Sequence, residues 1–218
     1  MCIIKKMRIV FKKNRINKDM KRICVILLVC IAASFVAKAQ YFSVKTNVLY
    51  DLTATLNLGA EFRLAPRWTL DISGNYNPWT FGTSEETMKK WKHAMIQPEA
   101  RYWFCESLNG HFIAFHAQGG AFNWKMQNDF EGFKFLGSDL SRLAYERLQG
   151  YFLGGGIAYG YSWLLSPHWN FEAEIGIGYS YIWYDVYECV GCGRKIEEDQ
   201  RHHYVGPTKA ALNLVYVF

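Results

Sequence analysis

The C-terminal segment from Tyr204 to Phe218 alternates between two kinds of side chain over its whole length. Successive side chains of a β-strand point to opposite faces, so this alternation predicts a strand with two unlike faces. One face carries only apolar residues: Ala210, Leu212, Leu214, Tyr216 and Phe218. The other face is mixed: Lys209, Ala211, Asn213, Val215 and Val217. An apolar face opposite a partly polar one is typical of a strand that separates lipid from the interior of a β-barrel.

Seven further segments alternate in the same way, and no run of eighteen apolar residues follows Ala39. The alternation is weakest in 110–122, where it does not assign the two faces. The eight predicted strands are 42–50, 56–64, 67–76, 93–104, 110–122, 151–164, 169–183 and 205–218. Strands of about 9–11 residues have the length of a tilted transmembrane β-strand.

The connections between these strands are sorted by length. Those after the second, fourth and sixth strands are tight, at 65–66, 105–109 and 165–168. Those after the third, fifth and seventh are long, at 77–92, 123–150 and 184–204, and a short helix is expected over 138–148. The first connection, 51–55, is short where a long one is expected. Sorting of this kind predicts an eight-stranded antiparallel up-and-down transmembrane β-barrel of the OmpA/OmpX architecture, with both termini in the periplasm.

The N-terminal residues 1–39 read as a signal peptide. Lys21 and Arg22 precede a short apolar run at 23–31, and Ala37 to Ala39 form a small-x-small cleavage site. Met20 is the expected true start, and processing as a lipoprotein at Cys30 is disfavoured by the large residue before it. Ten of the 25 basic and one of the 19 acidic residues lie in 1–39, so the mature part, 40–218, carries a net charge of −3. No nucleic-acid partner is expected.

The polar faces of the predicted strands would line the interior of the barrel. They hold nine charges: Lys45, Glu61, Arg63, Asp71, Glu99, Arg101, Glu172, Glu174 and Lys209. An unpaired buried charge is costly, so four bases and five acids predict a paired network. Eight strands leave room only for side chains, with small residues on 151–164 helping them to fit. We therefore expect a plugged barrel that conducts no solute.

The last long loop contains Cys189 and Cys192, followed by His202 and His203. A zinc site is one interpretation of two thiols and two imidazoles. A loop disulfide is favoured because exported proteins meet an oxidising compartment. Cys105 lies in a connection at the opposite end and should not reach this pair. No metal or cofactor is predicted.

The serines and histidines of the predicted strands give no sign of an enzymatic function. Their spacing marks no nucleophile with a base and an orienting acid, so no catalytic residue is predicted. Two alternatives to a non-catalytic barrel stay open. One is a soluble periplasmic barrel that holds a ligand and turns its Leu, Ile and Trp faces inward; the other is an outer-membrane enzyme that modifies lipid.

Several tracts of the sequence are distinctive: KTNVLYD at 45–51, NLG at 57–59, SGNYNPWT at 73–80, QPEARYW at 97–103, YECVGC at 187–192 and GPTK at 206–209. Together they resemble an uncharacterised family of Bacteroidetes outer-membrane proteins, a domain of unknown function whose genes are often near fimbrial operons. The resemblance covers the whole mature chain and implies residence in the outer membrane of a Gram-negative bacterium. It supplies no catalytic residues.

These observations predict a structural or adhesive barrel with a role in assembling or anchoring surface fibres. Its expected partners are outer-membrane lipid, the barrel-assembly machinery and fimbrial or other surface proteins. The chain would present its long loops on a rigid scaffold. The expected insertion signal is the apolar face at the end of the chain: Leu212, Leu214, Tyr216 and Phe218.

Overall fold

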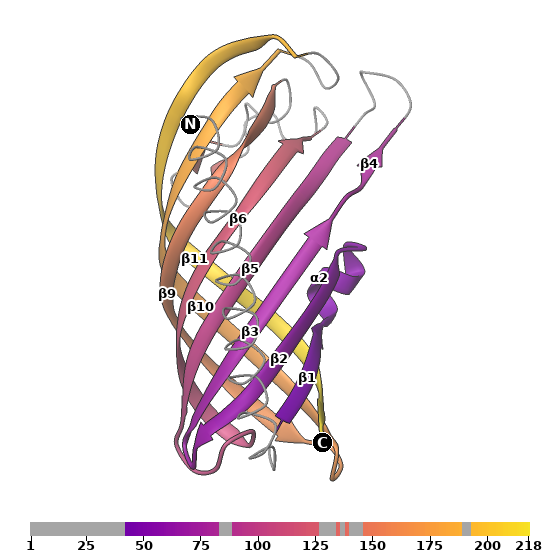
Figure 1. Ribbon diagram of the computed structural model, residues 1–218, viewed down its shortest axis with the longest axis vertical. Coiled ribbons are helices and arrows are strands. Elements are labelled where there is room, and N and C mark those ends of the chain that lie inside the picture. Colours follow the sequence, from indigo (N-terminus) through magenta and orange to yellow (C-terminus); the bar gives the residue numbers. More distant parts are fainter. Residues whose placement is uncertain (1–41, 83–88, 127–133, 136–137, 140–145, 189–192) are drawn as a thin grey trace, which may run out of the picture. The chain divides into compact units, whose positions relative to one another are not determined.

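Eight antiparallel strands form a closed ring in which each strand pairs with the next one along the chain (Figure 1). The computed structural model describes residues 42–218 except for 83–88, 127–133, 136–137, 140–145 and 189–192. The predicted signal peptide, Cys189 and Cys192 therefore lie outside the described residues. The ring strands are β1 (Phe42–Asn47), β2 (Leu56–Ala65), β3 (Trp68–Asn77), β5 (Lys89–Trp103), β6 (Gly110–Lys125), β9 (Arg147–Leu164), β10 (Trp169–Tyr187) and β11 (Lys195–Val217).

Pairing of the first strand with the last closes the ring, with Ser43 opposite Val217 and Asn47 opposite Asn213. Three two-residue strands lie in the connections: β4 (Thr80–Phe81), which pairs with β5, and β7 (Lys134–Phe135) with β8 (Ser138–Asp139). The all-β class and the ring of eight antiparallel strands in sequence order are confirmed.

Several strands are longer than their alternation predicts, and the long connections are correspondingly shorter. β9, β10 and β11 remain paired as far as Arg147, Tyr187 and Lys195, so only 188–194 connects the last two strands. The pairing extends into polar segments. Water can reach both faces of the sheet there, so polar and apolar residues do not alternate in the sequence of these segments. The prediction of a helix over 138–148 is wrong at 138–139 and 147–148, which belong to β8 and β9.

The strand predicted over 42–50 is wrong after Asn47, where a short helix begins. This helix, α2 (Val48–Leu52), starts at Asn47, whose side-chain oxygen accepts a hydrogen bond from the Leu49 N–H at 3.1 Å. Asparagine is a favoured N-cap because it satisfies a helix N–H that has no partner within the helix. Figure 1 shows α2 beside β1 and β2.

Burial in the ring is inverted relative to a water-soluble fold. The large buried side chains include Arg101, Glu61, Glu99 and Glu172, while apolar side chains such as Leu58 are exposed. On β11, Ala211, Asn213 and Val215 are buried and the predicted apolar face points outward. We call the end of the ring that carries the short connections 66–67, 104–109 and 165–168 the turn end. A small apolar core, built around Trp103 and Phe112, lies at this end.

The described residues include no helix that is both long enough and apolar enough to cross a membrane.

Candidate functional site: the charge cluster and the adjoining cavity

Lys45 on β1 is the first of three cations held inside the ring. Its ammonium contacts the carboxylates of Glu61, of Asp71 at 2.8 Å and of Glu172 at 3.2 Å. The partners come from β2, β3 and β10, so one lysine ties four strands together. Its side chain is 4 % exposed, and a lysine buried to this extent is stable only with paired charge.

Arg101 on β5 is the second cation and is fully buried. Its Nε lies 2.5 Å from Glu99 Oε1, and its Nη2 lies 2.8 Å from Glu174 Oε2. Nη1 bridges Glu61 at 3.0 Å and Glu172 at 3.1 Å. The planar guanidinium with its fork of N–H donors suits this role, because one side chain reaches four carboxylates in different directions.

Lys209 on β11 is the third cation. Its ammonium lies 2.5 Å from Glu99 Oε2 and 3.3 Å from Glu174 Oε2. His116 on β6 approaches the same Glu99 oxygen at 4.0 Å, and its other ring nitrogen lies 2.9 Å from Thr208 Oγ1. We call Lys45, Arg101, Lys209 and the carboxylates of Glu61, Asp71, Glu99, Glu172 and Glu174 the charge cluster.

Strand register accounts for the position of the cluster. Glu61 lies directly opposite Asp71, and Asp71 lies directly opposite Glu99. Like charges in such cross-strand positions repel each other. The ring offsets this repulsion by turning Lys45 and Arg101 inward beside them, so that each of these carboxylates lies within 4.0 Å of a cation.

Polar and aromatic neighbours support the cluster at the turn end. The Thr69 hydroxyl donates to Glu61 at 2.5 Å, and the Trp103 indole N–H donates to the Thr69 hydroxyl at 2.9 Å. The Arg101 guanidinium lies 4.5 Å from the centre of the Phe112 ring. Gly160 on β9 makes room for that ring, because a Cβ at position 160 would lie 2.3 Å from Phe112 Cζ.

Eight of the nine charges that the sequence assigns to the interior meet in the charge cluster. Arg63, the ninth, is half-buried near the turn between β2 and β3 and is not in the cluster. The inward face of β6 was not assigned from the sequence; in the structure Phe112, Ala114, His116 and Gln118 point inward. Its register against Glu99 and Arg101 would have identified that face.

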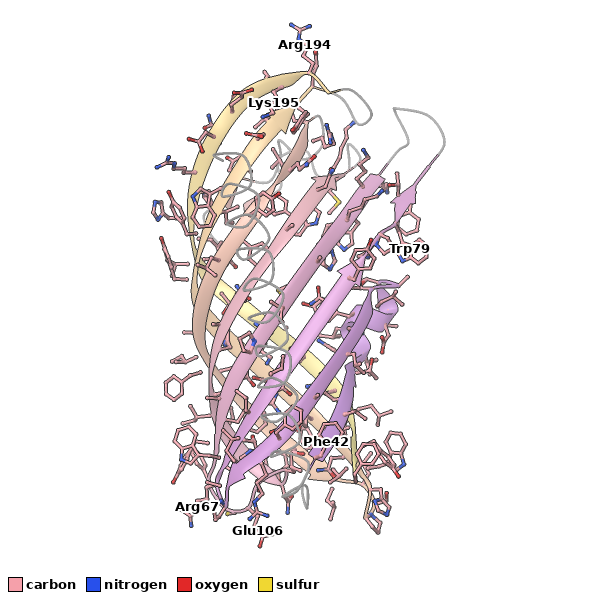
Figure 2. The ribbon with its side chains drawn as sticks, in the orientation of Figure 1. Phe42, Arg67, Trp79, Glu106, Arg194 and Lys195 are labelled. Carbon is pink, nitrogen blue, oxygen red and sulfur yellow. The ribbon has the colours of Figure 1, made fainter. Side chains whose placement is uncertain are left out.

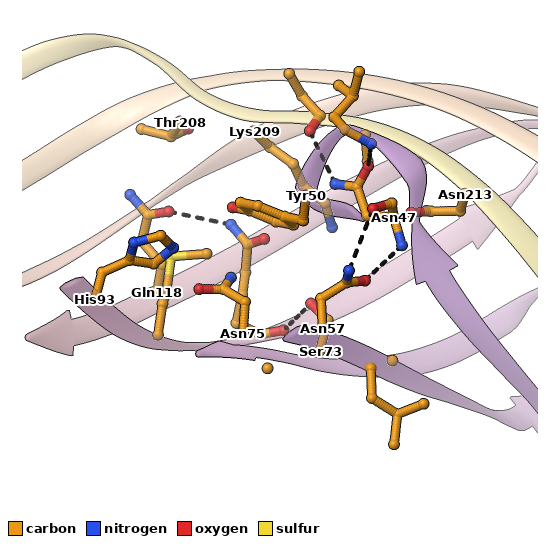
Figure 3. A pocket seen from close by; sticks show the side chains of 18 of the residues that line it. Asn47, Tyr50, Asn57, Ser73, Asn75, His93, Gln118, Thr208, Lys209 and Asn213 are labelled. Atoms are coloured by element: carbon orange, nitrogen blue, oxygen red, sulfur yellow. Dashed lines mark hydrogen bonds between the residues drawn. The ribbon is translucent and has the colours of Figure 1, made fainter. Parts of the chain in front are cut away.

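A cavity of about 510 Å³ adjoins the charge cluster inside the ring. Asp71 and Lys209 line its cluster end, and Asn75, Tyr50 and His93 line it further along (Figure 3). The Trp91 and Trp124 rings also line it and stack 5.1 Å apart. These aromatic residues and α2 were not part of the sequence-predicted site. The sequence could have identified Trp91 and His93, because they share a face of β5 with Gln97 and Glu99, which were predicted to point inward.

The strand wall of the cavity is interrupted where β1 ends. The β1–β11 pairing stops at Asn47 and Asn213, so among the described residues the part of β11 that precedes Asn213 has no paired strand on the β1 side. Asn47 covers this edge: its amide donates to the Ala210 carbonyl at 3.3 Å, and its side-chain oxygen accepts from the Leu212 N–H at 3.2 Å. Pro207 has no N–H to leave unpaired, and its carbonyl accepts from the Tyr204 hydroxyl at 3.1 Å. Proline at an edge removes a donor that would otherwise need a partner.

Cys189 and Cys192 lie outside the described residues, so the disulfide and the zinc site considered for the last connection stay predictions. In the described part of the chain, no group of three or more His, Cys, Asp or Glu side chains is arranged to hold a metal ion. The Tyr179 hydroxyl and the His203 Nδ1 share a hydrogen bond of 2.6 Å, and His202 is half-buried. Cys105 is exposed and has a free thiol in the turn between β5 and β6.

One comparison with known proteins identifies a relationship. No curated protein and no solved structure shows a significant match to this chain. A family model described as "Protein of unknown function (DUF3575)" matches residues 24–218, which is most of the chain and all of the ring. The chain therefore belongs to the DUF3575 family.

Proposed function

We propose that this protein is an outer-membrane β-barrel of a Gram-negative bacterium, plugged by its charge cluster, that presents surface loops as a structural or adhesive scaffold. The observation that carries the proposal is the inversion of the ring, with charge inside and a continuous apolar surface outside.

The outward positions of the ring strands are free of charge over a broad band. On β2 they are Leu56, Leu58, Ala60, Phe62 and Leu64. On β10 they are Phe171, Ala173, Ile175, Ile177 and Tyr179. No Asp, Glu, Lys or Arg occupies an outward position of this band on any described ring strand. Apolar patches on soluble monomers rarely exceed a few hundred Å², so an uncharged band around the whole ring fits lipid.

Aromatic side chains mark the edge of the band at the turn end. They are Phe42, Trp68, Tyr102, Phe104, Tyr161, Trp163, Trp169, Tyr216 and Phe218. Neighbouring rings touch from strand to strand, for example Phe42 and Phe218 at 5.3 Å between centroids. Figure 2 shows Phe42 at this end, with the charged Arg67 and Glu106 in the turns beyond it. Amphipathic rings at this level are typical of a membrane interface.

Exposed tyrosines mark the other edge of the band. Tyr76 lies eight residues along β3 from Trp68, and Tyr179 lies ten residues along β10 from Trp169. Ten residues span roughly 33 Å along a strand, or roughly 25 Å along the ring axis at a tilt of about 40°. This height equals the apolar band of known outer-membrane barrels, about 25 Å.

The far ends of β10 and β11 extend beyond this band and carry charge. β11 has 23 residues, so more than half of its length lies outside a span of about ten residues. Lys195 pairs with Asp185 at 2.9 Å, and a hydrogen bond from the Asp199 N–H, followed by Lys195, holds the pKa of Asp185 below its usual range. Figure 2 shows Arg194 and Lys195 at this end. A paired extension of this kind is a firm base for surface loops.

The interior supports a plugged barrel. The charge cluster links six of the eight ring strands, β1, β2, β3, β5, β10 and β11, and the side chains of Arg101, Glu61 and Glu99 have no exposed surface. A continuous water-filled channel requires a wider ring than eight strands provide. We therefore expect planar-bilayer recordings of the folded protein to show no steady channel current.

The experiment that tests the proposal is gel mobility of the protein from an outer-membrane fraction, with and without boiling. A membrane-bound band whose mobility changes on heating supports the barrel. A band in the soluble periplasm that shows no shift contradicts it. Labelling of Cys105 by a membrane-impermeant thiol reagent only after the outer membrane is opened would support a periplasmic turn end.

Deletion of the gene separates the scaffold from a lipid-modifying enzyme. Lost fimbriae or adhesion with an unchanged lipid profile supports the scaffold, and an altered lipid profile supports the enzyme. The soluble ligand-binding alternative requires the Leu, Ile and Trp faces to point inward, whereas Leu56, Ile175 and Trp169 are 61 %, 64 % and 43 % exposed.

A further inference from the structure

The cavity beside the charge cluster is lined by buried acceptor oxygens that the described residues leave unsatisfied. Asp71 is 1 % exposed and lines the cavity; its Oδ2 lies 2.8 Å from the Lys45 ammonium, whereas its Oδ1 accepts no hydrogen bond from the described residues. Asn75, on the same face of β3, is 8 % exposed; its side chain hydrogen-bonds that of Tyr50, and its side-chain oxygen accepts no hydrogen bond from the described residues. A buried acceptor without a donor is costly, so these positions favour a ligand that carries N–H groups.

Most donors of the cluster are engaged by carboxylates other than Asp71. Lys45 donates to Glu61 and Glu172, and Arg101 donates to Glu61, Glu99, Glu172 and Glu174. Asp71 has only an ion pair with Lys45 and a distant one of 3.9 Å with Arg101.

The cluster also contains more acids than bases. Its five carboxylates face three cations, so its formal charge is −2. An anionic ligand would add to this excess, while a cationic group would reduce it. The aromatic and apolar lining further along the cavity favours an organic ammonium as that cationic group.

The remainder of the cavity is suited to an apolar body. Met95 on β5 lies opposite Asn75 on β3. Further along β5, Trp91 stacks on Trp124 of the neighbouring strand β6. Phe152 adds a third ring to the lining. The Trp124 indole N–H has no described acceptor, which leaves a position for an oxygen on the ligand. Aromatic faces also attract a cation electrostatically.

We propose that this cavity binds an amphiphilic amine, with its ammonium group on Asp71 and its apolar body extending past Asn75 toward Trp91 and Trp124. The ligand reaches the cavity beside α2, where the strand wall is interrupted and the edge of β11 is covered by Asn47 and Pro207. This inference adds a ligand to the proposed scaffold. The binding site lies inside the ring, so binding is measured on folded protein in detergent. The result does not depend on where the protein is located in the cell.

The probe is monodansylcadaverine, a primary amine joined to a fluorophore by a five-carbon chain and a sulfonamide. The full chain is purified folded in a non-ionic detergent, and energy transfer from tryptophan to the dansyl group is measured as the probe is added. The matched probe is dansyl-6-aminohexanoate, which has the same fluorophore and a similar chain but ends in a carboxylate. We expect saturable transfer with the amine and none with the acid.

Two variants test the assigned position, and a third is their control. Asp71→Asn keeps the shape of the side chain and removes its charge, and should weaken binding of the amine by about tenfold or more. Met95→Trp fills the cavity without altering the charge cluster, and should abolish binding. Asp185→Asn makes the same chemical change on the exposed extension and should leave binding unchanged. Heat-dependent gel mobility shows that each variant is folded.

Three results would overturn the inference. The first is an absence of saturable transfer, which would mean that the cavity holds only water. The second is equal transfer from the amine and the acid probes, which would mean non-specific partition into detergent or protein. The third is unchanged binding in the folded Met95→Trp variant, or in Asp71→Asn, which would place the amine elsewhere.

Discussion

Replacing Arg101 by methionine is the most informative single change in the interior. Methionine has a similar length and no charge, so the variant leaves Glu61, Glu99, Glu172 and Glu174 without the guanidinium that joins them. Lys45 still contacts Glu61 and Glu172, and Lys209 still contacts Glu99 and Glu174. Two ammonium groups then face the five carboxylates of the cluster. Removing one partner from a buried ion network costs about 3–5 kcal/mol, a large part of the roughly 5–15 kcal/mol that stabilises a typical domain.

The free energy of unfolding is measured by urea titration of protein refolded in lipid vesicles, with tryptophan fluorescence and gel mobility as independent readouts. Arg67→Met, in an exposed turn, is the matched control and should change the free energy by less than about 0.5 kcal/mol. Adding Glu174→Gln to Arg101→Met should recover part of the loss, because one carboxylate then needs no partner. If Arg101→Met unfolds within about 0.5 kcal/mol of the natural protein, the network does not stabilise the ring.

Three further changes test other parts of the structure. Ile175→Arg places a charge on the outer band and should cost about 2–4 kcal/mol in vesicles, measured by the same titration. Gly160→Ala brings a Cβ to 2.3 Å from Phe112 and should cost about 1–3 kcal/mol by overpacking, whereas an unchanged urea midpoint would contradict that contact. Asn47→Ala removes the cover on the β11 edge, so the amide hydrogen of Leu212 should exchange faster; equal protection would show that Asn47 does not protect this edge.

The sequence predicted the interior charges because period-two alternation assigns a face to every residue of a strand. It could not predict which charges meet, since Lys45 and Glu172 are 127 residues apart and their contact depends on ring closure and strand register. Arg63 shows the same limit. The period-two alternation of β2 predicts that Arg63 points inward. Its position near the end of β2 leaves it half-buried and outside the charge cluster.

The features that alternation missed have local causes. α2 interrupts a predicted strand because Asn47 caps a helix, and five helical residues are too few to show a helical period. The extensions of β10 and β11 lack alternation because water can reach both faces. The cavity was missed because it depends on inward aromatic residues of β5 and β6, whose faces become clear only from the pairing of these strands.

The proposed membrane barrel requires the outward apolar band to be in contact with lipid. Nuclear magnetic resonance of methyl-labelled protein in lipid nanodiscs tests this without altering a residue. We predict nuclear Overhauser effects from lipid acyl chains to the methyl groups of Leu58, Ile96 and Ile175, and none to Val215, which is fully buried on the inward face of β11. Contact with water instead of acyl chains at the first three residues would contradict the proposed membrane barrel.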